Sequence, residues 1–274
     1  MNYIGSKHKL ASFLKTAITE VVGEDMSELV FCDLFAGTGI VGRNFKPFVK
    51  QVIANDVEFY SYILNRNYIG NHIPITIEKE LAILNNLEGV EGFIFQNYCE
   101  NGSEGRLYFS SENGKKIDAM RQQIEVWKNT NTINNDAYYF LLASLIESAD
   151  KVANTASVYG AYLKKIKKSA QKELVLQPAI FEFTKKPHQV FNEDGNVLIK
   201  QIKGDILYLD PPYNARQYGS NYHLLTTIAK YDTFKPQGKT GLRSYYRSSY
   251  CKKNEVKKSF VELIKNANFK YIFL

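Results

Sequence analysis

One short apolar run, which ends at an acid, two prolines and a tyrosine, constrains this chain most strongly. Residues 206–209 are Ile, Leu, Tyr and Leu, and they lead directly into Asp210-Pro-Pro-Tyr213. The apolar run predicts a buried strand, and the prolines end it because they cannot continue a hydrogen-bonded ladder. Asp210 is therefore expected at the carboxyl end of a central strand, where ligands bind in open α/β sheets.

The turn after this strand carries groups that suit a planar ring with an amine. Pro211 and Pro212 have a fixed φ and no N–H, so the backbone carbonyls there are rigid and left to accept hydrogen bonds. The Asp210 carboxylate adds a second acceptor, and the Tyr213 ring adds a surface for stacking. A strand that ends in a simple Pro-Pro turn with a capping Asp is the alternative for this motif taken alone.

A second strand signal lies near the amino terminus and opens a nucleotide-binding type of unit. The apolar residues 29–32 run into Asp33-Leu-Phe35-Ala-Gly37-Thr-Gly39, and a helix-compatible segment follows. The glycines allow a ligand to approach the backbone. The spacing matches neither the dinucleotide fingerprint nor a P-loop, and an acid at the strand end would repel pyrophosphate. A ligand with an amine and no phosphate is expected, and S-adenosylmethionine has this character.

Further acids follow predicted strands. Asp56 comes after the strand at 51–54, roughly 20 residues beyond the glycines, where an acid accepts from ribose hydroxyls. Glu193 and Asp194 come after the strand at 189–191, where an acid could accept from the amino group of an adenine. The alternatives are a helix cap for Asp56 and simple turn acids for Glu193 and Asp194.

Composition bounds the class of protein and its partners. The chain has 274 residues and a net charge of +7, and its three cysteines are scattered without metal-site or disulfide spacing. A globular, cytoplasmic protein without metal is expected, with no segment apolar enough for a membrane. The positive charge favours a polyanionic partner, although plain solubility is the alternative.

Basic residues gather in two further places. Residues 159–168 interleave tyrosines and lysines, with a solvated helix face as the alternative, and residues 235–253 form a long loop that contains no acid. A long basic loop beside a site fits the clamping of a phosphate backbone. The candidate DNA contacts are Lys164, Lys165, Arg216, Tyr222, Lys239, Arg243 and Arg247.

Taken together, these motifs resemble the Dam-like DNA adenine-N6 methyltransferases (D12 class, α order), in which the cofactor motif precedes the catalytic one. Asp33 to Gly39 is similar to their cofactor loop, and Asp210 to Tyr213 to their catalytic motif. The first ten residues resemble their amino-terminal cofactor segment. The resemblance covers residues 1–70 and 188–274 and implies one discontinuous catalytic domain, with 71–187 inserted as a target-recognition region.

The resemblance implies a Rossmann-like α/β sheet with helices on both faces and a mainly helical insertion. It implies transfer of a methyl group from S-adenosylmethionine to N6 of an adenine flipped out of double-stranded DNA, in a restriction-modification system with a cognate endonuclease. Asp210, Pro211, Pro212 and Tyr213 would hold the adenine. The residues expected to border the cofactor are Tyr3, Gly5, Lys7, Asp33, Phe35, Gly37, Gly39, Asp56, Asp194 and Asp210.

The chain departs from the family pattern at its end. The family sheet has seven strands, whereas this chain stops within the predicted fifth strand, at residues 269–274. We therefore expect missing carboxyl-terminal strands, weak activity of the chain alone, and a truncated, frameshifted or split enzyme with a complementary chain. The alternative functions are cytosine-N4 methylation, methylation of RNA or protein amides, and a binding remnant without turnover.

Overall fold

The computed structural model describes all residues except 1–6, 8, 9, 72 and 214. The chain forms two compact units. The sheet unit comprises Gly5–Pro74, Ile180–Tyr218 and Tyr246–Leu274, and the helical unit contains Ile75–Ala179 and Gly219–Tyr245. Residues 219–245 thus group with the helices. The predicted domain boundaries, and the role of 71–187 in target recognition, stay predictions.

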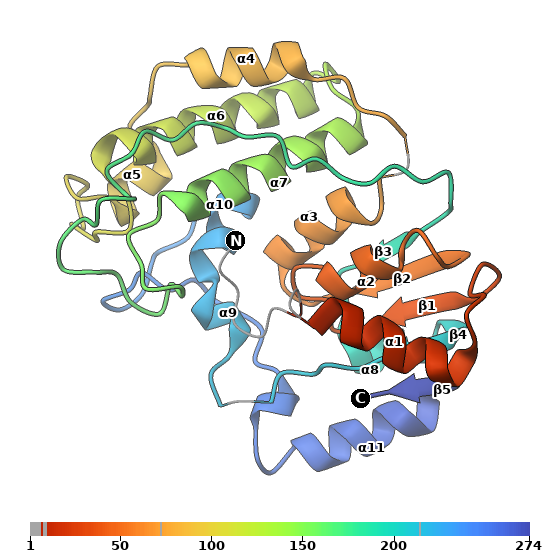
Figure 1. The fold of residues 1–274 in the computed structure, drawn as a ribbon. Coiled ribbons are helices and arrows are strands. Elements are labelled where there is room, and N and C mark those ends of the chain that lie inside the picture. Colours follow the sequence, from red (N-terminus) through yellow and green to blue (C-terminus); the bar gives the residue numbers. More distant parts are fainter. Residues whose placement is uncertain (1–6, 8–9, 72, 214) are drawn as a thin grey trace. The chain divides into compact units, whose positions relative to one another are not determined.

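A parallel sheet in the order β3-β2-β1-β4-β5 forms the centre of the sheet unit (Figure 1). Its strands are β1 (Val30–Asp33), β2 (Gln51–Asn55), β3 (Gln189–Phe191), β4 (Lys203–Tyr208) and β5 (Asn268–Phe273). In the register of the central pair, Asp33 lies opposite Tyr208. Chain order reverses between β1 and β4, so the gap at their carboxyl ends is the topological switch point at which α/β sheets bind ligands.

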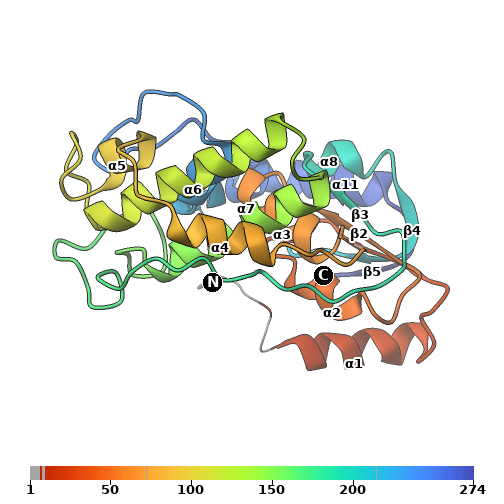
Figure 2. The ribbon, with the colours of Figure 1, turned by 90° about the horizontal axis from the view of Figure 1, so that it is seen from above.

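Helices cover both faces of this sheet, as Figures 1 and 2 show. The helices of the sheet unit are α1 (Ala11–Val22), α2 (Ile40–Phe45), α3 (Phe59–Tyr68), α8 (Gly195–Leu198) and α11 (Val256–Asn266), with a short 3-10 turn, η2 (Ser249–Cys251). In Figure 2, α1 and α2 lie on one side of the strands and α8 and α11 on the other. The predicted α/β class, with a parallel sheet flanked by helices, is confirmed.

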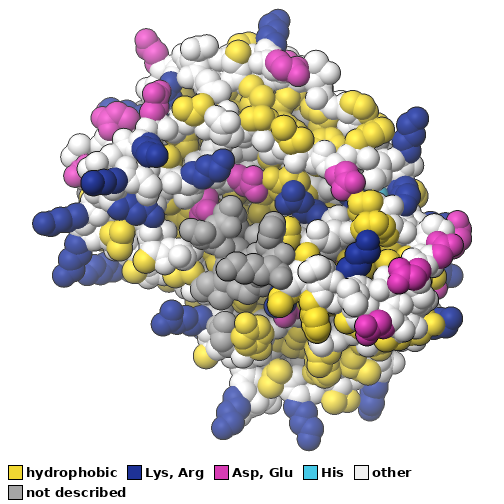
Figure 3. All heavy atoms as spheres, in the orientation of Figure 1, with side chains coloured by type: hydrophobic (Ala, Val, Ile, Leu, Met, Phe, Trp, Pro, Cys, Tyr) yellow, Lys and Arg dark blue, Asp and Glu magenta, His cyan; other side chains and the backbone are white. Residues whose placement is uncertain are grey.

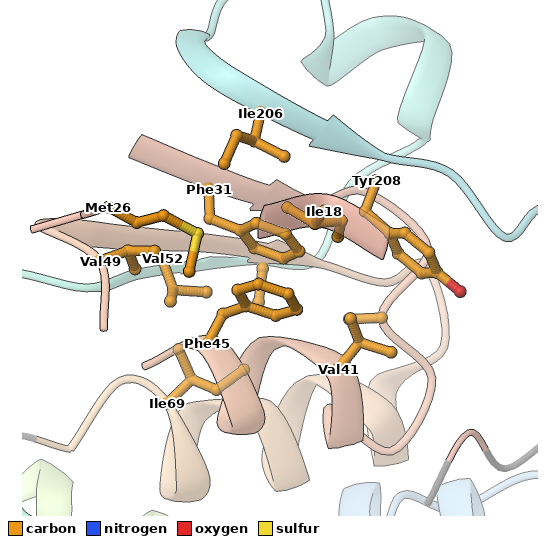
Figure 4. Close-up of a cluster of buried hydrophobic side chains, with 12 residues drawn as sticks. Ile18, Met26, Phe31, Val41, Phe45, Val49, Val52, Ile69, Ile206 and Tyr208 are labelled. Atoms are coloured by element: carbon orange, nitrogen blue, oxygen red, sulfur yellow. The ribbon is translucent and has the colours of Figure 1, made fainter. Parts of the chain in front are cut away.

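Alternation along the strands explains the two layers. Phe31 of β1 faces α1 and α2, where its ring stacks on Phe45 with centroids 4.3 Å apart (Figure 4). The next residue, Cys32, faces the opposite cluster, which contains Leu198 of α8 and Leu263 of α11. Successive strand residues point to opposite faces, so a strand buried on both sides reads as a continuous apolar run. The central strands can therefore be predicted from the sequence.

The helical unit contains α4 (Glu78–Asn86), α5 (Phe93–Tyr98), α6 (Ser111–Asn129), α7 (Asn135–Lys151), most of α9 (Tyr218–Asn221), and α10 (His223–Lys230). Side chains of Ser110 and Asn134 cap the amino ends of α6 and α7. The buried guanidinium of Arg121, on α6, donates to the carbonyls of Ile228 and Ala229 at the end of α10. Among the described residues, the helices are too short or too polar to cross a bilayer.

The basic stretch at 159–168 is not a helix, so the solvated-helix alternative is wrong. The side chain of Asn154 organises this segment instead. It donates to the carbonyls of Leu107 and Leu163, at 2.8 and 3.0 Å, and accepts from the N–H of Lys167. An amide that satisfies three backbone groups holds an irregular segment in one conformation, because buried polar groups need partners.

Candidate active site

The turn after β1 is closely packed around its glycines. Gly37 and Gly39 have φ values of 53° and 76°, in the left-handed region that glycine tolerates best. A Cβ on Gly39 would lie 2.5 Å from Oδ1 of Asn65, so a larger residue does not fit. The Asn65 amide donates to the Gly37 carbonyl at 3.0 Å, which fixes α3 to the turn.

Asp33, at the end of β1, is a buried acid with spare hydrogen-bonding capacity. Its side chain is 1% exposed, and Oδ2 accepts from the N–H of Gly42 at 3.2 Å. Its other oxygen, Oδ1, has no hydrogen-bond partner among the described residues. Burial, together with the negative charges of Asp210 and Asp56, raises the pKa of Asp33 to about 7. A carboxylate in this setting would gain most from a ligand that brings a positive charge.

Asp56 ties the end of β2 to the same turn. Its carboxylate accepts from the N–H groups of Gly37 and Glu58, each at 2.8 Å. Burial raises the pKa of Asp56 to about 6. The Asp56 carboxylate thus holds the glycine turn and the residue that precedes α3, whereas the N-cap position of that helix belongs to Glu58. Contact of Asp56 with a ribose stays a prediction.

Asn55 is a structural residue that sequence reasoning missed. Its side chain donates to the carbonyls of Leu34 and Glu193 and accepts from the N–H of Glu193. The amide thereby joins the carboxyl ends of three strands. Its position beside Asp56 was the only signal in the sequence, because its partners lie far away along the chain.

Asp194 serves as the cap of α8. Its Oδ1 accepts from the N–H groups of Asn196 and Val197, and its Oδ2 accepts from the hydroxyl of Tyr246. The adjacent Gly195 lies against the ring of Phe35, because a Cβ there would be 3.2 Å from it. Contact of Asp194 with a cofactor stays a prediction.

Asp210, just beyond β4, is more open than Asp33. Its side chain is 29% exposed, and Oδ2 forms an ion pair with the ammonium of Lys7 at 2.7 Å. The positive charge of Lys7 also opposes the rise in the pKa of Asp33, whereas the negative charge of Asp210 adds to it. The three side chains therefore interact electrostatically. Pro211 and Pro212 are half-buried, whereas Tyr213 is 70% exposed. The predicted cofactor residues Tyr3 and Gly5 lie outside the described residues.

The candidate DNA contacts differ in exposure. Those with exposed side chains are Lys164, Lys165, Arg216, Lys239 and Arg247. Tyr222 is completely buried, and the Arg243 side chain, 9% exposed, is paired with Asp232. The structure therefore gives these two residues packing and bracing positions.

Charge alone does not locate the DNA-binding surface. Lys164 and Lys165 line a cavity of about 870 Å³ together with Glu100, Glu112 and Glu173, so its charge is mixed. In Figure 3, lysine and arginine side chains lie around the edge of the face and also at several places within it. Within the described part of the chain, no cluster of His, Cys, Asp and Glu could hold a metal ion.

Comparisons with known proteins identify the family of the chain. The model of the D12 class N6 adenine-specific DNA methyltransferases matches residues 3–274. The chain is 64% identical to the type II methyltransferase M.NlaIII of Neisseria lactamica, covering all of the chain and 82% of that protein. It is 44% identical to M.FokI of Planomicrobium okeanokoites, covering 100% of the chain and 44% of that protein.

M.CviAII of Paramecium bursaria Chlorella virus 1, a type II methyltransferase, is 39% identical over 98% of the chain and 80% of its own length. No solved structure matches the chain. The match to the family model runs through the glycine turn after β1 and the Asp-Pro-Pro-Tyr turn after β4. The chain therefore belongs to the family of D12 class N6 adenine-specific DNA methyltransferases.

Proposed function

We propose that this DNA adenine methyltransferase uses S-adenosylmethionine, which it binds at the turn after β1, and holds its target adenine at the turn after β4. The observation that carries this proposal is that two acids lie at the carboxyl ends of neighbouring parallel strands: Asp33 ends β1, opposite Tyr208 of β4, and Asp210 follows Tyr208 by two residues. A donor and an acceptor must meet for methyl transfer, and the switch point of the sheet brings two turns together.

The residues around Asp33 fit the proposed cofactor. Its unpartnered buried Oδ1 suits an ammonium group, and the glycines leave the backbone open to close approach. Asp56 keeps lone pairs beyond its two backbone hydrogen bonds, which suits ribose hydroxyls. A buried acid at the strand end opposes a pyrophosphate group. The cofactor would supply an electrophilic methyl group on a sulfonium.

The residues around Asp210 fit the adenine. The lone pair of N6 is delocalised into the ring, so the amine is a poor nucleophile. We propose that the Asp210 carboxylate and the Pro211 carbonyl accept the two N6 hydrogens and stabilise the positive charge that develops on the nitrogen. The exposed Tyr213 ring would stack on the base once it has left the duplex.

Lys7 would have to release Asp210 during this reaction. In the structure its ammonium occupies Oδ2 of Asp210, where an N6 hydrogen would bind. Lys7 would therefore act as a temporary counter-ion of the Asp210 carboxylate until the adenine arrives. Its predicted role beside the cofactor is compatible with this, because Lys7 also acts on Asp33.

We further propose a restriction-modification role with a cognate endonuclease, because relatives that cover the whole chain are named type II methyltransferases. The test is incubation of the purified chain with S-adenosylmethionine carrying a labelled methyl group and with DNA that contains all four bases. Digestion to nucleosides and mass spectrometry should find the label in N6-methyladenine. Label in N4-methylcytosine, or no transfer of the label to DNA, would refute the proposal.

A further inference from the structure

Residues 237–242 form a small hairpin within the long basic loop that the sequence predicts. Gln237 and Leu242 exchange both backbone hydrogen bonds, at 2.9 and 2.8 Å. Gly238 and Gly241 have φ values of 66° and 68°, which a tight turn of this kind requires. Gln237, Gly238 and Lys239 are exposed, so Lys239 stands at the tip of a defined turn.

Two buried side chains of the helical unit hold this hairpin in place. The guanidinium of Arg106 donates to the carbonyls of Gly238 and Lys239, each at 3.2 Å, although Arg106 itself is only 6% exposed. The hydroxyl of Tyr98 donates to the Gly241 carbonyl at 2.7 Å. A Cβ on Gly241 would lie 2.7 Å from the Tyr98 ring, so the turn lies directly against α5.

The base of the loop is braced separately. Arg243 forms two hydrogen bonds with the carboxylate of Asp232, both at 2.8 Å. Its guanidinium lies 4.9 Å from the ring centroid of Phe234, which in turn packs on Phe93 of α5. A bidentate, largely buried arginine has its charge matched within the protein. Arg243 therefore braces the loop and leaves Lys239 as its outward cation at the tip.

We propose that the hairpin 237–242 is a preformed DNA contact, in which the Lys239 ammonium meets a phosphate and Arg106 and Tyr98 act as positioning residues. The substrate is a polyanion, and residues 235–253 contain no acid that would repel it. A rigid turn loses little conformational entropy on binding, which is the advantage of holding it with buried donors. This inference goes beyond the proposed cofactor and adenine sites and does not depend on them.

The test measures binding of the full chain to a duplex DNA that it methylates, by fluorescence anisotropy over a series of salt concentrations. Lys239→Ala should weaken binding by roughly three- to tenfold and reduce the slope of log affinity against log salt by about 1, as expected for one lost phosphate contact. Lys235→Ala removes the same charge from the same loop outside the hairpin and is the matched control. It should change the slope much less.

Arg106→Gln should weaken binding and reduce the slope about as much as Lys239→Ala, although its side chain is buried. The double variant should be little weaker than either single variant, because Arg106 acts through Lys239. Tyr98→Phe removes only the hydroxyl that holds Gly241 and keeps the buried ring. It should also weaken DNA binding, and adding Lys239→Ala to it should weaken binding little further. Additive losses in the double variants, or equal slopes for Lys239→Ala and Lys235→Ala, would overturn the proposal.

Discussion

Asp33 and Asp210 lie at the carboxyl ends of neighbouring strands of one sheet, yet their surroundings are opposite. Asp33 is 1% exposed, with one oxygen unpartnered among the described residues, whereas the side chain of Asp210 is 29% exposed and paired with Lys7. The two acids have the same chemistry and nearly the same place in the fold. The difference shows that burial and partners, more than residue type, divide the roles proposed for them: a fixed cation site and an exchangeable amine site.

The turns that follow these acids differ in the same way. The turn after Asp33 is packed around Gly37 and Gly39 and held by Asn65 and Asp56. The turn after Asp210 ends in Tyr213, whose ring is 70% exposed. A closed turn suits a cofactor with a constant shape, and an open turn suits a base that arrives from a duplex.

A large difference should come from the exposed ring of Tyr213. Tyr213→Ala should lower the rate of methyl transfer by roughly 10- to 100-fold, because stacking on one base contributes about 1–3 kcal/mol. Tyr213→Phe keeps the ring and should retain a rate within about threefold of the original. Single-turnover transfer at saturating DNA measures both. Equal losses in the two variants would assign the effect to the hydroxyl and would contradict stacking by the ring.

A smaller effect should appear in stability at the closed turn. Gly39→Ala should lower the free energy of unfolding by about 2–3 kcal/mol, because a positive φ is combined with a Cβ 2.5 Å from Asn65 Oδ1. Gly23→Ala is the control, since Gly23 has a φ of 97° with no atom within 4 Å of the added Cβ. It should cost about 1 kcal/mol, the low end of the backbone strain expected for alanine in a conformation that favours glycine. Urea unfolding that gave equal costs would contradict a closely packed turn.

The smallest expected effect is the number of protons that the protein releases when the cofactor binds. Burial raises the pKa of Asp33 to about 7, so at pH 6.5 this acid is mostly protonated in the free protein. A cationic ligand lowers that pKa, and binding of S-adenosylmethionine should therefore release roughly half a proton or more. Calorimetry in two buffers of different ionisation enthalpy measures the release.

The raised pKa of Asp33 also sets the direction in which cofactor affinity and stability change with pH. Cofactor affinity should increase as the pH rises from about 6 to 8, whereas Asp33 should lower the stability of the free protein as the pH rises from about 4 to 7. Asp33→Asn should remove the proton release. Identical binding enthalpies in the two buffers for the original chain would contradict a protonated Asp33.

The sequence predicts the strands and their terminal acids because these are local signals. Residues 29–32 and 206–209 are apolar runs that end in an acid, and burial on both faces makes such runs continuous. The order of motifs also identifies the family. The glycine turn could be predicted because few residues other than glycine adopt its backbone conformation.

The sequence does not predict contacts between distant residues. Asn65 reaches Gly37, and Arg106 reaches Lys239, only after the chain has folded. The sequence also does not predict which side chains are exposed. Tyr222 and Lys239 lie in similar polar stretches, yet Tyr222 is buried and Lys239 is exposed. A list of candidate DNA contacts drawn from charge and aromaticity therefore mixed bracing residues with outward ones.

Cofactor titrations and methyl-transfer assays on two matched variants test whether Asp33 serves the cofactor and Asp210 serves the adenine. Asp210→Asn should change the affinity for S-adenosylmethionine by less than about threefold and lower transfer by more than about 100-fold, since a charged acceptor is lost. Asp33→Asn should weaken cofactor binding by about tenfold or more, because it loses a charge-assisted contact. Retained transfer by Asp210→Asn, or equal losses of cofactor affinity in both variants, would contradict these separate roles of the two acids.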